Sequence, residues 1–128
     1  MAAMDVLSSR LLLHPRDLAA SQGFYRDVLG LAVFRQFPGG EVYFLGNGLL
    51  EVSGGSSDGP SPTGLELWLQ VRDVGAEHDR LAALGVAVLR APRLEAWGLI
   101  ETWIADPDGV RIVLVQVPED HPLRRDDR

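Results

Sequence analysis

The sequence contains no cysteine and no lysine. Without cysteine, the chain has no disulfide framework, no thiolate metal site and no cysteine nucleophile. No apolar run reaches the length of a membrane-spanning segment, and residues 1–9 lack the basic region and apolar core of a signal peptide. We therefore expect a cytoplasmic protein with no membrane partner.

Positive charge is also scarce. Twelve cationic residues, all arginine, face 18 acidic ones, and the formal net charge is −6. A nucleic-acid partner would need a basic face, so none is expected. The sequence also lacks a Ser-His-Asp triad, a phosphate-binding glycine loop and a dinucleotide fingerprint. Its 128 residues are enough for one domain with a hydrophobic core.

The clearest local signal is an amphipathic helix predicted over residues 17–29. Asp17 is a strong N-cap, because its carboxylate can accept hydrogen bonds from the free N–H groups of the first turn. Leu18 and Tyr25 belong to an apolar stripe with helical spacing. Gly30 ends the helix, since glycine takes a positive φ without steric cost. Apolar runs on both sides predict a strand, a helix and a second strand.

The same pattern returns about 55 residues later, a module length and not a solenoid period. Asp73 takes the place of Asp17, and residues 84–88 repeat the pattern of residues 29–33. Two β-α-β-β-β modules are therefore predicted within a single domain. Their bounds are about 9–53 and 65–117, with a Gly-, Ser- and Pro-rich linker over 54–64 and a charged, disordered tail over 118–128.

Turn residues divide the apolar runs into short strands. Pro38-Gly39-Gly40 and Gly46-Asn47-Gly48 separate the last three strands of the first module. In the second module a strand is predicted over 86–89, followed by a looser segment over 90–98 that contains Pro92.

The capped helices, the Phe24-Tyr25 pair and the turn Asp106-Pro107-Asp108-Gly109 before the last strand resemble the vicinal-oxygen-chelate superfamily. This group contains glyoxalases, bleomycin-resistance proteins and extradiol dioxygenases. The resemblance covers both modules. It implies an α+β fold in which the two modules form a curled, cup-shaped mixed sheet with helices on its outer face. It also implies a small-molecule ligand inside the cup and a homodimer.

Catalytic members of that superfamily hold a divalent metal. The resemblance carries the metal-ligand positions over to Arg10, Glu51, Glu66 and Val113. A divalent ion needs several oxygen or imidazole ligands, whereas arginine is always cationic and valine has no donor atom. We therefore expect no cofactor. A divalent metal held in part by Glu51 and Glu66 is the alternative.

The alternation of side chains along the strands supports this placement of the site. In residues 65–71 the polar and aromatic side chains share one face, and leucines share the other. The aliphatic faces should pack on the helices, and the mixed faces should line the cup. The candidate ligand-binding residues are Arg10, His14, Glu51, Glu66, Trp68, Gln70, Trp97, Trp103, Arg111 and Val113.

Several candidates can be interpreted in more than one way. Arg10, Glu51 and Glu66 either anchor a polar ligand or form a self-neutralising ion pair, because buried charges must be paired. His14 is a candidate general base or metal ligand. Trp68 can stack on a flat ligand, whereas Trp103 is equally consistent with a place in the core.

Two classes of function follow from these residues. The first is a metal-independent protein that sequesters an antibiotic-like or other small organic ligand. The second is a metal-dependent lyase, isomerase or dioxygenase with a ligand set drawn from His14, Glu51 and Glu66. A metal-free enzyme that uses Glu51 or Glu66 as its general base lies between them.

Overall fold

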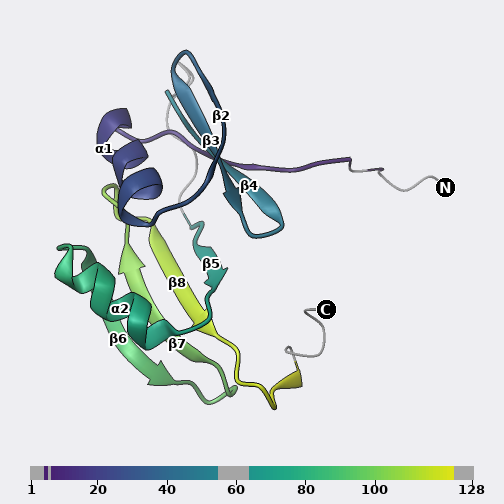
Figure 1. Ribbon diagram of the computed structural model, residues 1–128, viewed down its shortest axis with the longest axis vertical. Coiled ribbons are helices and arrows are strands. Elements are labelled where there is room, and N and C mark those ends of the chain that lie inside the picture. The colour runs from purple at the N-terminus through teal and green to yellow at the C-terminus, as the bar shows by residue number, and fades with distance from the viewer. Residues whose placement is uncertain (1–4, 6, 55–63, 123–128) are drawn as a thin grey trace. The chain divides into compact units, whose positions relative to one another are not determined.

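A computed structural model describes residues 5, 7–54 and 64–122 and divides the chain into two compact units, Met1–Pro62 and Thr63–Arg128. Each unit has the order β-α-β-β-β, which confirms the predicted α+β fold with two modules (Figure 1). Most of the predicted linker, the end of the predicted tail and the first residues of the chain lie outside the described residues. The elements are β1 Leu11–Leu13, α1 Leu18–Gly23, η1 Phe24–Val28, β2 Val33–Phe37, β3 Gly40–Leu45, β4 Gly48–Ser53, β5 Leu67–Gln70, α2 Val74–Ala83, β6 Ala87–Leu94, β7 Ile100–Ala105 and β8 Arg111–Gln116.

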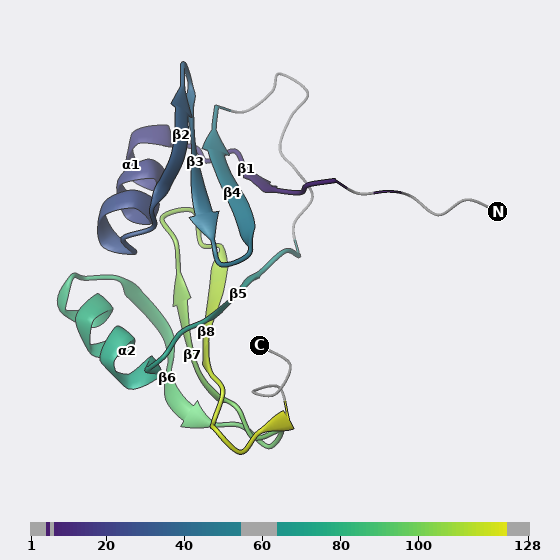
Figure 2. The ribbon, with the colours of Figure 1, turned by 45° about the vertical axis from the view of Figure 1, so that its right-hand side comes forward.

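The first unit holds a four-stranded sheet in the order β1-β4-β3-β2. β1 runs parallel to β4, and the other neighbours are antiparallel. One face of this sheet carries Tyr43, Leu50 and Val52, all fully buried, and α1 lies against it (Figure 2). Tyr25 from the helical segment packs on this face, with its ring stacked 6.5 Å from that of Tyr43.

The predicted first helix is present but is not uniformly α-helical. Asp17 caps it as expected, since its Oδ1 accepts a hydrogen bond from the N–H of Ala20 at 3.0 Å. The α-helix ends at Gly23, and a π-helical turn, η1, continues to Val28 before Gly30 takes a φ of 77°. This wider turn carries Arg26, whose guanidinium reaches a buried carboxylate on β3.

The second unit repeats the topology, with the order β5-β8-β7-β6 and one parallel pair, β5 with β8. α2 begins at the Asp73 cap and contacts β6, β7 and β8. Val74 and Leu81 of this helix are buried with Ile104 and Ile112 of the sheet. The prediction that the aliphatic faces pack on the helices is therefore confirmed in both units.

The predicted looser segment after residue 89 was wrong in its first half. β6 continues to Leu94, with register shifts against β7 around Arg90. Pro92 is tolerated because β6 is the edge strand of its sheet and shifts in register leave unpaired backbone positions.

The start of the predicted disordered tail is also ordered. The backbone N–H of His121 donates to the carbonyl of Pro118 at 3.0 Å, and its Nε2 lies 3.0 Å from the carbonyl oxygen of Trp97. These contacts hold residues 118–121 against the loop between β6 and β7.

Candidate functional site

The candidate residues lie on or beside the faces of the two sheets that the helices do not cover, which we call the open faces, except for Trp97, which lies in the loop between β6 and β7. On the first sheet, Leu12 pairs with Glu51, so the residues that flank β1 fall beside β4. Arg10 Nη1 lies 2.9 Å from Glu51 Oε1, and Ser53 Oγ donates to Glu51 Oε2 at 2.9 Å. His14 Nδ1 lies 3.5 Å from Ser53 Oγ. Arg10, Glu51, Ser53 and His14 thus form one polar row.

Hydrogen bonding keeps the Glu51 carboxylate ionised. The hydrogen bond from Ser53 lowers the pKa of Glu51 most, partial burial opposes this, and Arg10 lowers it further. Glu51 is therefore a hydrogen-bond acceptor and not a proton donor at neutral pH. The adjacent imidazole has a defined tautomer, because His14 Nδ1 lies 3.2 Å from the carbonyl oxygen of Ser53, which can only accept. Its Nε2 therefore keeps a lone pair when the ring is neutral.

On the second sheet, Trp103 is the centre of the open face. It lies on β7, between β6 and β8, and it packs against the buried cluster of Leu99, Val113, Val115 and Val117. Two guanidinium groups contact its ring. The Cζ of Arg90 lies 3.7 Å from a ring centroid and that of Arg111 lies 4.4 Å from one. Trp103 is thus both a core residue and a surface for cations.

Two buried carboxylates neutralise part of this positive charge. Glu95 and Glu101 are each 6 % exposed. Arg90 forms ion pairs with both, and Arg93 Nε lies 3.3 Å from Glu95. Glu101 also accepts from Trp97 Nε1 at 2.9 Å and from Trp103 Nε1 at 3.3 Å. The network fixes both indoles at this end of the sheet.

The other end of this open face is exposed to solvent. Glu66 precedes β5, and its carboxylate lies 3.4 Å from Arg111 Nη1. Trp68 pairs in register with Val113 and is 51 % exposed. Gln70, two residues further along the same strand, is also exposed. The candidates therefore fall into two groups: Arg10, His14 and Glu51 on the first sheet, and Glu66, Trp68, Gln70, Trp97, Trp103, Arg111 and Val113 on the second.

The sequence model of the Glyoxalase/Bleomycin resistance protein/Dioxygenase superfamily matches residues 9–114, from just before β1 into β8, the last strand of the second unit. The chain belongs to this superfamily. The family match confirms the resemblance inferred from the capped helices and the turn before β8.

Solved structures of glyoxalase-related proteins share the fold. A glyoxalase-related enzyme from Fulvimarina pelagi is 25 % identical, with a TM-score of 0.73 over 90 % of each chain. A glyoxalase/bleomycin resistance protein/dioxygenase from Nocardioides is 19 % identical, with a TM-score of 0.71 over 95 % of this chain and 90 % of that one. A lactoylglutathione lyase from Agrobacterium tumefaciens is 20 % identical, with a TM-score of 0.65 over 90 % of this chain and 96 % of that one. No curated protein matches.

The side chains at the four positions that the resemblance predicts as metal ligands do not fit a divalent ion. Arg10 brings a guanidinium to one position, and Val113 offers no donor atom at another. The two carboxylates, Glu51 and Glu66, each face an arginine within their own unit. Within neither unit does the described part of the chain group three histidine, aspartate or glutamate side chains in a way that could hold a metal.

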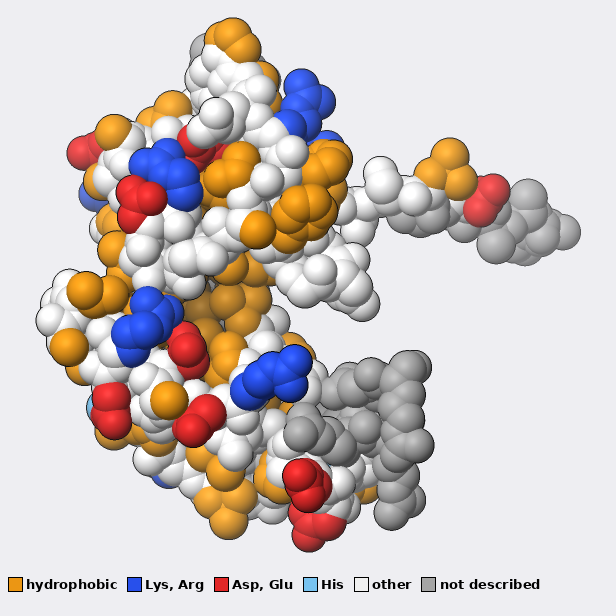
Figure 3. All heavy atoms as spheres, in the orientation of Figure 1, with side chains coloured by type: hydrophobic (Ala, Val, Ile, Leu, Met, Phe, Trp, Pro, Cys, Tyr) orange, Lys and Arg blue, Asp and Glu red, His pale blue; other side chains and the backbone are white. Residues whose placement is uncertain are grey.

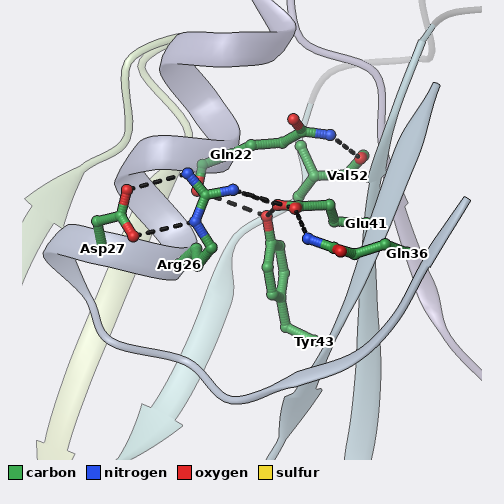
Figure 4. A network of polar contacts seen from close by, with 7 residues as sticks. All are labelled: Gln22, Arg26, Asp27, Gln36, Glu41, Tyr43 and Val52. Atoms are coloured by element: carbon green, nitrogen blue, oxygen red, sulfur yellow. Dashed lines mark hydrogen bonds and ion pairs between the residues drawn. The ribbon is translucent and has the colours of Figure 1, made fainter. Parts of the chain in front are cut away.

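Sequence reasoning missed a second charged network in the first unit, on the face that α1 covers (Figure 4). Glu41 on β3 is buried and accepts hydrogen bonds from Arg26 on the π-helical turn, from Tyr43 Oη at 2.6 Å and from Gln36 Nε2 at 2.5 Å. Asp27 also pairs with Arg26, through two hydrogen bonds of 3.0 Å each. The available signal was a glutamate that shares its strand face with Tyr43, where an apolar residue is usual.

The ionisation of this network follows from its hydrogen bonds. Burial opposes the charge on Glu41, but hydrogen bonds from Tyr43, Gln36 and Arg26 outweigh it and lower the pKa of the carboxyl. Burial, together with the hydrogen bond to Glu41, raises the pKa of Tyr43. All donors are directed at one carboxylate that lies away from the open face, so this network has a structural role.

On the face shown in Figure 3, several arginine side chains of each unit lie next to acidic ones. No helix in the described part of the chain is long and apolar enough to cross a membrane.

Proposed function

We propose that this chain is a metal-independent binding protein of the glyoxalase/bleomycin-resistance type, which sequesters an antibiotic-like or other small organic ligand on the open faces of its sheets. One observation carries the proposal. The four positions to which the resemblance assigns metal ligands are Arg10, Val113 and two carboxylates, each of which already pairs with an arginine. The same faces present the exposed indole of Trp68 and several hydrogen-bonding groups, which suit an organic molecule.

The electrostatics oppose a metal at the first sheet. The Arg10 guanidinium lies 2.9 Å from Glu51 Oε1 and already occupies the position beside this carboxylate. Two unit charges of the same sign at 4 Å repel by about 4 kcal/mol at an effective dielectric constant near 20, and a divalent ion roughly doubles this.

A metal-dependent lyase, isomerase or dioxygenase is the second candidate. It is favoured by the placement of His14 and Glu51, since both side chains contact Ser53 and His14 retains a free Nε2 lone pair. The ligand set would then differ from that of the catalytic relatives, because Arg10 lies in the same row.

Elemental analysis and native mass spectrometry separate the two candidates. The protein is purified without chelator, dialysed, and measured for zinc, nickel, iron and manganese. We expect less than stoichiometric metal and, in the native spectrum, an organic adduct that is lost on denaturation. One metal per chain that survives dialysis would favour the metal-dependent enzyme and contradict the proposal.

We further propose that the chain forms a homodimer. Among the described residues, β1 and β2 form the edges of the first sheet, and β5 and β6 form the edges of the second. The first unit also exposes a pair of aromatic rings, Phe34 and Phe44, each 47 % exposed with their centroids 5.2 Å apart. Sedimentation at micromolar concentration should give twice the chain mass of 14.0 kDa, and a single species at the chain mass would contradict a dimer.

A further inference from the structure

The two arginines that contact Trp103 differ in what neutralises them. Arg90 forms ion pairs with Glu95 and Glu101, both of which are buried. Its guanidinium is therefore held inside the fold. Arg111 faces only Glu66 among the described acidic side chains, at 3.4 Å, and the two side chains are 42 % and 45 % exposed. An ion pair this open to water contributes little to stability, so a ligand carboxylate can replace Glu66 at little cost.

The guanidinium of Arg111 is also oriented in advance. Its Cζ lies 4.4 Å from a ring centroid of Trp103, and the indole is itself fixed by its hydrogen bond to Glu101. A planar guanidinium presents a fork that matches a carboxylate with two parallel hydrogen bonds. Because the aromatic contact restricts the side chain, less conformational entropy is lost when an anion binds.

An exposed aromatic surface lies beside this cation. Trp68 follows Glu66, the residue directly before β5, by two positions, and extended backbone places side chains two residues apart on the same side. Trp68 pairs with Val113 on β8, two residues after Arg111, which makes Trp68 and Arg111 diagonal neighbours on adjacent strands. Neighbouring strands lie about 5 Å apart, so the long arginine side chain and the indole can reach across this diagonal. Trp68 is 51 % exposed, so a large part of its indole is accessible to solvent.

We propose that this surface binds a planar aromatic carboxylate. The ring of the ligand stacks on Trp68, and its carboxylate takes the place of Glu66 on the guanidinium of Arg111. Gln70, the next exposed residue on this face of β5, provides a hydrogen-bonding group for a substituent at the far end of the ring. This inference rests on the proposed binding function and adds the chemical class of the ligand.

The proposal is tested with 2-naphthoate and its neutral analogue 2-naphthamide, which differ only in the acid group. Each is titrated into the full chain, with ligand-observed NMR and calorimetry as readouts. We expect the carboxylate to bind about tenfold more tightly than the amide, or by about 1.4 kcal/mol, because only the carboxylate accepts charge-assisted hydrogen bonds from the guanidinium of Arg111.

Substitutions separate the contributions of the ligand's carboxylate and of its aromatic ring to the binding affinity. Arg111→Gln should abolish the preference for the acid, whereas Arg72→Gln, which removes an exposed arginine elsewhere in the unit, should leave it unchanged. Glu66→Gln removes the competing carboxylate and should tighten naphthoate binding about threefold, within the range of an exposed ion pair. Trp68→Ala should weaken both probes by the same factor, because it removes the stacking surface and not the charge.

Equal affinity of the wild type for the two probes, no detectable binding of either, or a preference that survives Arg111→Gln would overturn the inference. It would also be overturned if Trp68→Ala left both affinities unchanged but altered sedimentation, because a second copy of the chain would then be the partner of this surface. The proposed function and the proposed ligand class can be contradicted independently of each other. An organic adduct in the native spectrum that persists in Arg111→Gln would support sequestration while excluding this ligand class.

Discussion

Arg26 Nη1 lies 3.0 Å from both carboxylate oxygens of Glu41. The contact joins the π-helical turn η1 to β3, an interior strand of the first sheet. Glu41 is 6 % exposed, so its charge depends on these donors. The Arg26–Glu41 pair therefore couples the position of the π-helical turn to the ionisation of the buried Glu41 carboxylate.

Replacing Glu41 tests this connection. Glu41→Gln keeps the size of the side chain but removes the charge and places an amide N–H₂ group among donors. We expect the free energy of unfolding to fall by about 1.5–3 kcal/mol, the usual contribution of hydrogen bonds to a charged group. Urea denaturation measures this free energy of unfolding. Glu77→Gln, which removes an exposed carboxylate paired with Arg80, should change it by less than about 1 kcal/mol.

The same pair gives the protein a defined response to acid. The pKa of Glu41 in the folded state is lowered from its ordinary value of 4.5, so the unfolded state binds the proton more readily. The stabilisation is complete above pH 4.5 and is lost as the pH falls through the folded-state pKa. The difference in unfolding free energy between wild type and Glu41→Gln should therefore be constant near neutral pH and shrink in acid. A difference that is equal at pH 7 and pH 3 would contradict the lowered pKa.

A close approach between two strands gives a prediction about packing. A Cβ added at Gly40 would overlap the ring of Phe37 and lie 2.9 Å from the Cβ of Ser53. Gly40→Ala should therefore destabilise the protein by about 1–3 kcal/mol, as overpacking in a core usually does. Gly48→Ala is the matched control, since its nearest neighbour, the carbonyl of Leu45, lies at 3.6 Å. Similar melting temperatures for the two variants would show that the Phe37 ring moves aside freely.

The last prediction concerns the cation in the polar row. Arg10→His places an imidazole beside Glu51 and removes the fixed positive charge that we expect to exclude a metal. The variant should gain affinity for nickel or zinc, measured by calorimetry, and Arg10→His combined with Glu51→Gln should lose that gain. If Arg10→His binds no more metal than wild type, these two positions do not converge as metal ligands in the superfamily's manner.

Much of the fold could be read from local signals. Asp17 and Asp73 cap their helices as predicted, because capping depends on a few adjacent residues and their backbone N–H groups. Gly30 and Gly85 take positive φ values of 77° and 83° at the ends of the two helical segments, where glycine alone is unstrained. The division into helices and strands and the family resemblance follow from such signals together with hydrophobic alternation.

The pairing of charges was decided by tertiary structure. Strand alternation placed Arg111 and Glu66 on mixed faces, but it could not show that they meet across β5 and β8, since this depends on the register of two strands 45 residues apart. Arg90, Glu95 and Glu101 were overlooked for the same reason: their network forms only because β6 continues through Arg90 and turns back as β7. The sequence by itself therefore determined most of the elements, their faces and the family resemblance, because these depend on local propensity and periodicity, whereas the π-helical turn and the full length of β6 were not predicted. Which carboxylate each arginine neutralises, and hence which cation is open to a ligand, was decided by register and burial, which arise only when distant segments pack.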